Sequence, residues 1–326
     1  MKTRKSVRRM TRSPLALVRA ASATAAKVLP PYSSKFSRKD FTQHQLFALL
    51  VLREFLKTDY RGLEQLLRDW SDLRQALCLC KVPDHSTLQK AFVRLLKKKD
   101  IDALFQQTVT QACAIGLIGP KPRGVIDATG YETRHISRYF FWRAGKRRRG
   151  SFWPKLTAVL ETETHFFLSA HVTRGPSHDS PQFKHTVRAA QAGCPLDTLL
   201  GDTAYDSEHN HIYGRERLRI RSTVFPLNPR NTGRRWPKTR YRRQMHRRFR
   251  SRSGHRSRRV YGQRWQIESG WSRNKRRLGS ALRARIWANQ KNEVRMRIVT
   301  HNLMLLAGPK DFDKAPQGLK RCSHFS

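Results

Sequence analysis

The chain has 326 residues, of which 67 are Lys or Arg and only 23 are Asp or Glu, so its formal net charge is +44. Self-repulsion at this charge opposes folding unless a polyanion is nearby, and nucleic acid is the usual partner of such a surface. The sequence has no apolar run of the roughly 18 residues that cross a bilayer, and its five scattered cysteines indicate a reducing compartment and no disulfide scaffold.

The first 35 residues are predicted to form a basic, flexible arm. Residues 1–30 contain no acidic residue and are rich in Arg, Ser and Ala. We expect this arm to touch DNA phosphates without sequence specificity. The same composition also suits a transit peptide, which stays open as an alternative.

Residues 36–116 are predicted to form a small all-helical domain. Apolar residues recur every three or four positions in QHQLFALLVLREFL, in YRGLEQLLRDW and in STLQKAFVRLLKKK, where Asp84 or Ser86 is placed to cap the third helix. Short helices with Arg and Lys on their outer face fit a DNA-binding domain of the helix-turn-helix kind. A helical domain that only braces its neighbour fits the spacing equally well.

From about residue 117 to 308 the pattern predicts an α/β domain with a mixed sheet. The run GVIDATG is a short strand, and KLTAVLETETHFFLSAHVT predicts two strands joined by a turn near Glu163. A helix is predicted to start at Asp179, and the strand LDTLLGD is followed by a helix near Ser207 and a strand STVFPL. Strands that follow an antiparallel hairpin and alternate with helices indicate a mixed sheet flanked by helices.

The predicted α/β domain includes a basic, irregular segment at residues 229–259. It contains no carboxylate and many arginines, so we expect it to be partly disordered without its ligand. Four of its arginines are expected to bind the DNA backbone: Arg242, Arg243, Arg247 and Arg248. A long helix from about residue 260 to 279, a last helix at about 290–306 and an irregular tail at 309–326 follow.

Because acidic residues are scarce, their positions mark places where a cation can bind. Asp127 and Asp202 each end an apolar strand, and ligands usually bind at strand ends in α/β sheets. An ordinary turn aspartate is the alternative for each of them. Asp206 competes with Asp202, but its position just before Ser207 favours a helix cap.

Glu268 is the only acidic residue between Glu216 and Glu293. At 100° per residue, Tyr261, Arg264, Glu268 and Lys275 fall on one narrow stripe of a helix, which is too polar for a core. Arg264 and Lys275 would suit DNA phosphates, while Glu268 would face metal ions. The alternative is an ordinary ion pair between Arg264 and Glu268, which is worth only about 0.3–0.5 kcal/mol and does not account for the other two residues.

These segments together resemble a bacterial insertion-sequence transposase of the DDE class. The resemblance lies in VIDATG, in LLGDTAYDS and in YGQRWQIESGWSRNK, which carries the Y-R-E-K signature of that family. The closing RIVTHNLMLL also resembles the end of the family's catalytic domain, and the resemblance covers about residues 36–306.

The resemblance implies a ribonuclease-H-like domain at residues 117–308, in which Asp127, Asp202 and Glu268 are the catalytic residues and the ligands of two Mg²⁺ (or Mn²⁺) ions. Two such ions can stabilise the attacking and leaving oxygens of a phosphodiester displacement. The implied activity is cleavage at transposon ends and joining of the freed 3′-hydroxyl to target DNA. Some relatives insert a large β-rich domain before the glutamate, whereas the corresponding interval here is short and basic.

The resemblance also implies the partners and the location. Double-stranded DNA, as inverted repeats and target, is the expected partner of a homodimer or larger assembly, with Tyr261, Arg264 and Lys275 among the DNA-binding residues. The expected location is the bacterial cytoplasm, on the nucleoid. Three alternatives stay open: a related nuclease, an inactive domesticated copy, and a non-enzymatic basic protein that coats nucleic acid.

Overall fold

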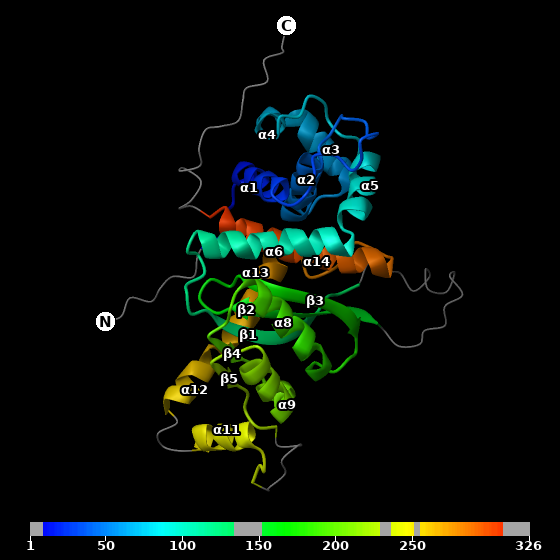
Figure 1. The fold of residues 1–326 in the computed structure, drawn as a ribbon. Coiled ribbons are helices and arrows are strands. Elements are labelled where there is room, and N and C mark those ends of the chain that lie inside the picture. The colour runs from blue at the N-terminus through cyan, green and yellow to red at the C-terminus, as the bar shows by residue number, and fades with distance from the viewer. Residues whose placement is uncertain (1–8, 134–151, 229–235, 251–254, 309–326) are drawn as a thin grey trace, which may run out of the picture. The chain divides into compact units, whose positions relative to one another are not determined.

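The computed structural model describes residues 9–133, 152–228, 236–250 and 255–308 (Figure 1). The chain divides into two compact units, one formed by Val109–Ile298 and one by Arg8–Thr108 together with the chain from Val299 onward. The long helices α6 and α14 each contribute residues to both units. The predicted tail at 309–326 lies outside the described residues.

The helical unit is built from short helices around an apolar core. This core is formed by buried side chains from several helices, among them Leu17, Phe47, Leu63, Leu88 and Leu95. Helix α2 begins with a capping box, in which Thr42 and Gln45 satisfy each other's backbone N–H groups. The helices are α1 (Pro14–Ala26), α2 (Gln43–Leu56), α3 (Tyr60–Asp69), α4 (Ser71–Ala76), α5 (His85–Leu95) and the first part of α6 (Lys98–Ala114).

The prediction of a flexible arm over residues 1–35 is wrong for Pro14–Ala26, which form helix α1. Ser13 caps this helix by accepting a hydrogen bond from the Ala16 N–H, and Pro14 occupies its first position. Leu17 and Val18 are fully buried against the unit's other helices. The basic composition of the segment hid a buried face that consists of Leu17, Val18, Thr24 and three alanines. Residues 1–8 lie outside the described residues.

The second unit is centred on a five-stranded mixed sheet with the strand order β3-β2-β1-β4-β5. The neighbours β1, β2 and β3 are antiparallel, whereas β1, β4 and β5 run parallel. The strands are β1 (Arg123–Gly130), β2 (Trp153–Glu161), β3 (Phe167–Gly175), β4 (Thr198–Leu200) and β5 (Ser222–Val224). This confirms the predicted α/β class, the predicted hairpin with its turn at Glu163, and the presence of helices before the sheet.

Helices flank this sheet. Helix α8 packs against β2 and β3, and α13 packs against β1. At Gly270 of α13 a Cβ atom would lie only 2.8 Å from Leu160 Cδ1 of β2, so the absent side chain permits a close helix–sheet contact. The helical elements of this unit are η1 (Ser180–Gln182), α8 (Phe183–Gly193), η2 (Thr203–Tyr205), α9 (Glu208–Ile212), η3 (Tyr213–Arg217), α11 (Arg240–Arg250), α12 (His255–Tyr261), η5 (Gly262–Trp265), α13 (Gln266–Leu278) and the first part of α14 (Trp287–Leu306).

Two predictions about the basic region need correction. Residues 240–250 and 255–259, predicted to be irregular, belong to helices α11 and α12. In α11, Tyr241 and Met245 are buried one turn apart and anchor an otherwise polar helix. The predicted helix at 260–279 is interrupted by the 3₁₀ turn η5. Tyr261 and Arg264 therefore precede the regular helix that carries Glu268, and the four polar residues do not share one continuous α-helical stripe. Residues 229–235 and 251–254 lie outside the described residues.

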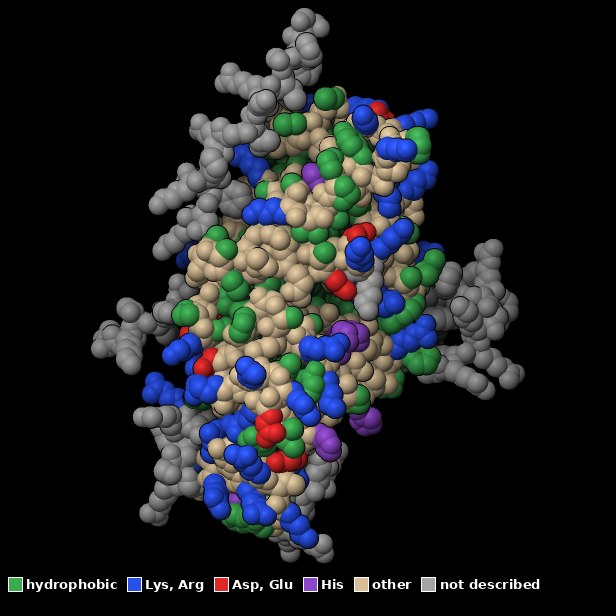
Figure 2. Space-filling model, viewed as in Figure 1, with side chains coloured by type: hydrophobic (Ala, Val, Ile, Leu, Met, Phe, Trp, Pro, Cys, Tyr) green, Lys and Arg blue, Asp and Glu red, His purple; other side chains and the backbone are tan. Residues whose placement is uncertain are grey.

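Within the described ranges, no helix is long and apolar enough to cross a membrane. Lys and Arg side chains are spread over the visible face, whereas Asp and Glu occupy only a few spots on it (Figure 2).

Candidate active site

Asp127 and Asp202 lie at the edge of the sheet where the pairing of β1 with β4 ends. Asp202 follows β4 as predicted, whereas Asp127 does not end its strand, because β1 continues to Gly130 and Asp127 pairs with Ala158 of β2. The parallel strands β1 and β4 pair in the register Val125 to Leu200, and each aspartate follows its member of this pair by two positions. Neighbouring strands are about 4.8 Å apart, so this register places the two carboxylates side by side. Asp202 Oδ1 also accepts a hydrogen bond of 2.8 Å from the Ala204 N–H and so caps the 3₁₀ turn η2.

The charge state of Asp127 reflects this crowding. Burial raises the pKa of its carboxyl from 3.8 to about 6, the negative charges of Asp202 and Asp179 add to the rise, and a hydrogen bond from the Ala128 N–H and the charge of Arg264 oppose it. A carboxylate that is desolvated and faces like charges gains from a bound cation. Perturbed acids of this kind are typical of functional sites.

Asp179 is a third acidic residue at this edge, and the sequence did not reveal it as such. The sequence predicts Asp179 as the start of a helix; here it precedes η1 without capping it and forms a 2.5 Å ion pair with Lys155 Nζ. Its charge acts on Asp127 and on the Tyr205 side chain. Asp179 reaches this position through the loop after β3, so no local sequence pattern could have placed it there.

Two tyrosines border the acidic cluster of Asp127, Asp179 and Asp202. Tyr205 is fully buried, and burial together with the charges of these three acids raises its pKa. Its hydroxyl group has no hydrogen-bond partner among the described residues. Tyr261 is half-buried, and its pKa is raised by burial, with Arg264 opposing and Asp202 and Asp127 adding to the rise. A buried hydroxyl group without a partner calls for an explanation, and a polar ligand bound beside it would be one.

Glu268 stands in the first turn of α13, and its side chain is 59% exposed. Its Oε1 accepts a 2.8 Å bond from Arg264 Nη2, which is the ion pair considered as the alternative from the sequence. Burial alone would lower the pKa of the Arg264 guanidinium, but the negative charges of Glu268 and Asp127 help to raise it. Arg264 therefore links Glu268 to the acidic cluster.

Helix α13 is anchored to the sheet by its later turns. Lys275 Nζ donates bonds of 2.8 Å to Thr129 Oγ1 and 2.7 Å to the Gly130 carbonyl, and Asn274 accepts a 2.8 Å bond from the Tyr131 hydroxyl. Lys275, predicted to contact DNA, thus serves as a structural link between α13 and β1, two residues beyond Asp127. The prediction of a DNA contact for Lys275 stays a prediction, but its ammonium group already has two acceptors.

The four predicted DNA-binding arginines of α11 have different surroundings. Arg242 forms a two-bond ion pair with the buried carboxylate of Asp206. The prediction that Asp206 caps a helix is wrong, because Ser207 stands at the N-cap of α9 and the Asp206 carboxylate accepts from Arg242 and the Asn228 N–H. Arg248 is half-buried near Ser222, and burial followed by the charge of Arg221 lowers its pKa. Arg243 and Arg247 are exposed.

The three predicted ligands do not form a closed ligand group. Among the described residues, only Glu64, Asp84 and His85 of the helical unit place three potential ligand atoms within 4.8 Å of one another. Their closeness has a structural cause. Glu64 accepts bonds from the His85 N–H, the His85 ring and Arg68, and Asp84 caps α5. Asp127 and Asp202 are brought together by the sheet, whereas Glu268 is held by Arg264.

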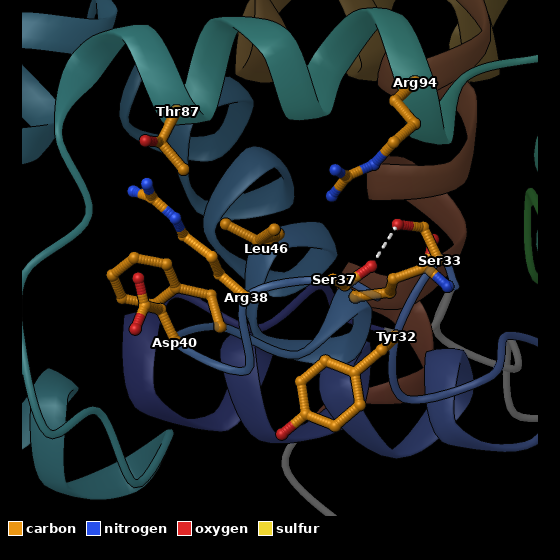
Figure 3. Close-up of a pocket in the computed structure, with 10 residues that line it drawn as sticks. Tyr32, Ser33, Ser37, Arg38, Asp40, Leu46, Thr87 and Arg94 are labelled. Carbon is orange, nitrogen blue, oxygen red and sulfur yellow. Dashed lines mark hydrogen bonds between the residues drawn. The ribbon is translucent and has the colours of Figure 1, made fainter. Parts of the chain in front are cut away.

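The helical unit contains a polar pocket of about 280 Å³ (Figure 3). The guanidinium groups of Arg38 and Arg94 point toward it, and the hydroxyl groups of Ser33 and Ser37 bond to each other at 2.9 Å on its border. Asp40, on the same border, forms an ion pair with Lys81. Acidic, basic and hydroxyl groups are thus mixed in this pocket.

An edge of a mixed sheet that gathers acidic residues, beside a helix with one more glutamate, defines a class of site suited to hard divalent cations. The profile of one protein family, the transposase DDE domain, matches residues 118–303. This range is more than half of the chain, so the chain belongs to the DDE transposase family. No curated protein matches it. The mixed sheet flanked by helices is consistent with the ribonuclease-H-like domain of these transposases.

Proposed function

We propose that this protein cleaves DNA at transposon ends and joins the freed 3′-hydroxyl to target DNA, with Asp127, Asp202 and Glu268 as its catalytic residues. One observation carries the proposal. The matched transposase domain brings Asp127 and Asp202 to the same edge of the sheet, where burial and like charge raise the pKa of Asp127 to about 6. A purely structural aspartate gains nothing from such a position, whereas a cation ligand does.

The residues present fit divalent metal ions. The acids are hard oxygen donors, their mutual repulsion is relieved by positive charge, and the buried Tyr205 hydroxyl beside them has no partner among the described residues. Asp127, Asp202 and Glu268 would hold Mg²⁺ or Mn²⁺, which when bound stabilise the attacking and leaving oxygens of phosphodiester chemistry. Glu268 would first exchange its bond to Arg264 for this role, and the freed guanidinium would suit a DNA phosphate.

The other parts of the proposal follow from the family and the charge. We assign DNA binding to the helical unit and to Tyr261 and Arg264, and we expect a homodimer or larger assembly on paired DNA ends. We also assign the chain to the bacterial insertion-sequence members with the Y-R-E-K signature. The net charge of +44 supports a DNA partner.

Strand cleavage by purified variants tests the proposal. The substrate is a labelled duplex that carries the ends of the encoding element, with Mg²⁺ present. Asp127→Asn and Asp202→Asn should each lower the cleavage rate at least about a thousandfold, roughly 4 kcal/mol of transition-state stabilisation, while the affinity for the duplex stays within about threefold. Asp102→Asn, an exposed acid of α6, is the matched control and should cleave like the parent.

The alternatives make different predictions in the same assay. A non-enzymatic coating protein binds the duplex without metal and is indifferent to both substitutions. A related nuclease cleaves but does not join a 3′-hydroxyl to a second duplex, and an inactive copy binds only. Cleavage by Asp127→Asn at the parent's rate would remove the proposed catalytic role.

A further inference from the structure

The α/β unit has a second site, a basic pocket that the catalytic proposal does not use. It lies between the π-helix η3 and helix α11 and has a volume of about 610 Å³. Its seven lining residues include five cationic side chains and no acidic one: Arg215, Lys238, Arg240, Arg243, Arg247, together with Tyr241 and Gln244. This composition calls for an anion.

The acids near α11 are already engaged. Glu208 accepts hydrogen bonds from the Tyr241 and Arg242 N–H groups at the start of the helix, where a negative charge also complements the helix dipole. Asp206 is paired with Arg242, and Glu216 accepts a 2.7 Å bond from the Tyr241 hydroxyl. The described residues show no ion pair between any of the five cationic lining side chains and a carboxylate.

The pocket's guanidinium groups crowd one another, and the acceptors that they bond in the described part of the chain are uncharged. Arg215 donates to Gln244 Oε1, and Arg243 donates to the Pro237 and Lys238 carbonyls. Arg215 and Arg240 lie over the Tyr241 ring, with 4.8 and 5.3 Å between each guanidinium carbon and the ring centroid. Arg215 Nε is buried and has no hydrogen-bond partner among the described residues. Burial lowers the pKa of Arg215, and the charges of Arg248 and Arg240 lower it further, while Tyr241 and Glu208 partly oppose the shift. A bound anion would relieve this repulsion and satisfy the free donors.

The accessibility of the Tyr241 ring decides whether the pocket can bind a base or a phosphate of a nucleic acid. Tyr241 is only 8% exposed, and the two guanidinium groups lie over its ring, so no base can stack on it. The donors that stay free are guanidinium and ammonium groups, which bind phosphates. We propose that this pocket binds phosphodiester groups of the DNA backbone at a place separate from the catalytic carboxylates. The inference takes its partner, DNA, from the proposed function.

The pocket is connected to the candidate active site through a short, bonded path. Arg242 on α11 holds Asp206 with two bonds of 3.0 and 2.9 Å, and Asp206 follows Asp202 by four residues, across the turn η2. A phosphate held beside α11 is thereby kept at a defined position relative to Asp202. The pocket would bind and position DNA without touching the reacting atoms.

The test uses the double variant Arg240→Gln/Arg247→Gln, because both side chains are exposed and form no hydrogen bond that the fold requires. Each lost phosphate contact lowers the slope of log affinity against log salt by roughly 0.9, so the slope should fall by about 2. The ratio of the parent's duplex affinity to that of the variant should therefore fall roughly tenfold when KCl is raised from about 50 to 200 mM.

Two controls accompany this variant. Lys121→Gln/Arg188→Gln removes two exposed charges of the same unit outside the pocket and should change the slope by less than half as much. Arg247→Gln alone should lower the slope by about 1, which keeps the test open if the double variant folds poorly. Equal slopes for the pocket variant and the charge-matched control would overturn the inference.

Free phosphate is the other source of the same chemistry. Inorganic phosphate and chloride are compared as competitors of duplex binding at equal ionic strength, and we expect no difference between them. Competition by phosphate that is specific to the parent and lost in Arg240→Gln/Arg247→Gln would assign the pocket to the free ion and overturn the DNA assignment.

The two proposals fail separately. A parent that cleaves DNA while the pocket variant keeps the parent's salt slope would retain the proposed function and remove the pocket. A parent that cleaves nothing with Mg²⁺, while the pocket variant loses slope as expected, would remove the proposed function and retain a phosphodiester-binding pocket.

Discussion

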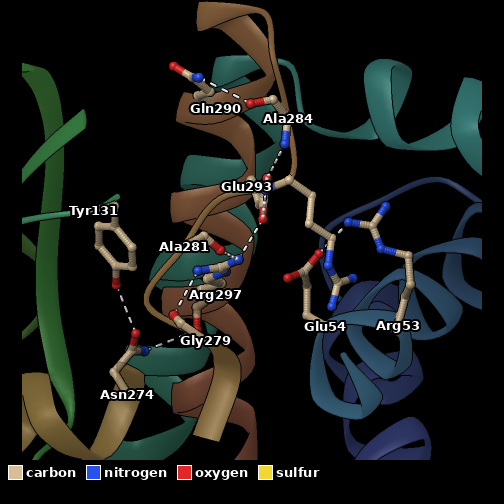
Figure 4. A network of polar contacts seen from close by, with 11 residues as sticks. Arg53, Glu54, Tyr131, Asn274, Gly279, Ala281, Ala284, Gln290, Glu293 and Arg297 are labelled. Atoms are coloured by element: carbon tan, nitrogen blue, oxygen red, sulfur yellow. Dashed lines mark hydrogen bonds and ion pairs between the residues drawn. The ribbon is translucent and has the colours of Figure 1, made fainter. Parts of the chain in front are cut away.

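Two arginine–glutamate pairs in the α/β unit have the same spacing of four residues but different surroundings. In α14, Arg297 Nη2 lies 2.6 Å from Glu293 Oε1, and each side chain is only 2% exposed (Figure 4). Before α13, Arg264 bonds Glu268 at 2.8 Å, with side chains 27% and 59% exposed. The first pair is enclosed by protein, whereas the second has room for another ligand.

The remaining bonds of each pair explain the difference. Arg297 also donates to the carbonyls of Gly279 and Ala281, and Glu293 accepts from the N–H groups of Arg283 and Ala284. These contacts fix the chain segment that joins α13 to α14. Within the described residues, the carboxylate of Glu268 bonds Arg264 and has no comparable set of backbone donors. The two pairs have the same residue types and spacing, so these do not tell them apart. Burial and the number of further hydrogen bonds distinguish a structural pair from one whose carboxylate can leave the arginine for a metal ion.

The largest expected effect comes from the exposed pair. Glu268→Gln should lower the DNA cleavage rate at least about a thousandfold, because it removes a proposed metal ligand. The free energy of unfolding should change by less than about 1 kcal/mol, since exposed pairs contribute little. Single-turnover cleavage and urea denaturation check the two parts. If Glu268→Gln lowered the stability and left cleavage unchanged, the Arg264–Glu268 pair would be structural, like Glu293–Arg297.

The buried pair should respond in the opposite way. Glu293→Gln leaves the Arg297 guanidinium buried without its counter-charge, which costs about 3–5 kcal/mol of stability. For a unit of this size, the melting temperature should fall by roughly 6–20 °C. Cleavage per folded molecule, measured well below the melting temperature, should stay within about threefold of the parent's. A melting temperature that matches that of Glu268→Gln would remove the distinction.

The charged Asp127 carboxylate should lower the free energy of unfolding at neutral pH. The folded chain holds the Asp127 proton more tightly than the unfolded chain between about pH 4 and 6, so the parent loses stability as the pH rises through this window, and the loss is complete above pH 6. Asp127→Asn removes this loss. In EDTA the variant should be more stable than the parent at pH 7–8 by on the order of 2 kcal/mol, with the difference vanishing near pH 4.

Urea denaturation across this pH range checks the prediction, with and without Mg²⁺. The metal ion should stabilise the parent and leave Asp127→Asn unchanged, because a ligand that binds only the folded site shifts unfolding by mass action. Equal stability of the two proteins in EDTA at pH 8 would contradict an electrostatic cost at this edge.

The sequence was sufficient for the parts of the molecule that depend on local patterns. The apolar runs that end at Asp127 and Asp202 predicted two strands, and the hairpin turn at Glu163 followed from its flanking β-rich segments. The closeness of the two aspartates did not follow from either run alone, because it depends on the parallel pairing of β1 with β4.

Features that depend on distant partners were not predictable in this way. Helix α11 has only two buried apolar anchors, and its start is held by Glu208, more than 30 residues earlier. Asp179 joins the acidic cluster through tertiary packing. The pairs at 264–268 and 293–297 have the same spacing, and no local pattern states that only the second becomes buried.

The smallest expected effect comes from a third ion pair, which is exposed but lies away from the acidic cluster. It therefore tests whether exposure alone makes a pair important for cleavage. Arg221 bonds Asp197 through two nitrogens at 2.7 and 2.6 Å, and their side chains are 73% and 20% exposed. The pair is about as open as Arg264–Glu268, yet Asp197 precedes β4 and so lies at the opposite end of that strand from Asp202. Hydrogen bonds from Arg221 hold the pKa of Asp197 below its usual value.

Asp197→Asn should therefore lower the free energy of unfolding at pH 7 by less than about 1 kcal/mol. The sign with pH is opposite to that of Asp127: the stabilisation is present above the ordinary aspartate pKa and disappears as the pH falls through the lowered one. DNA cleavage should match the parent's. A thousandfold loss of cleavage in Asp197→Asn would show that opening any exposed pair of this unit disables the protein, and the effect of Glu268→Gln could then no longer be attributed to its place beside the acidic cluster.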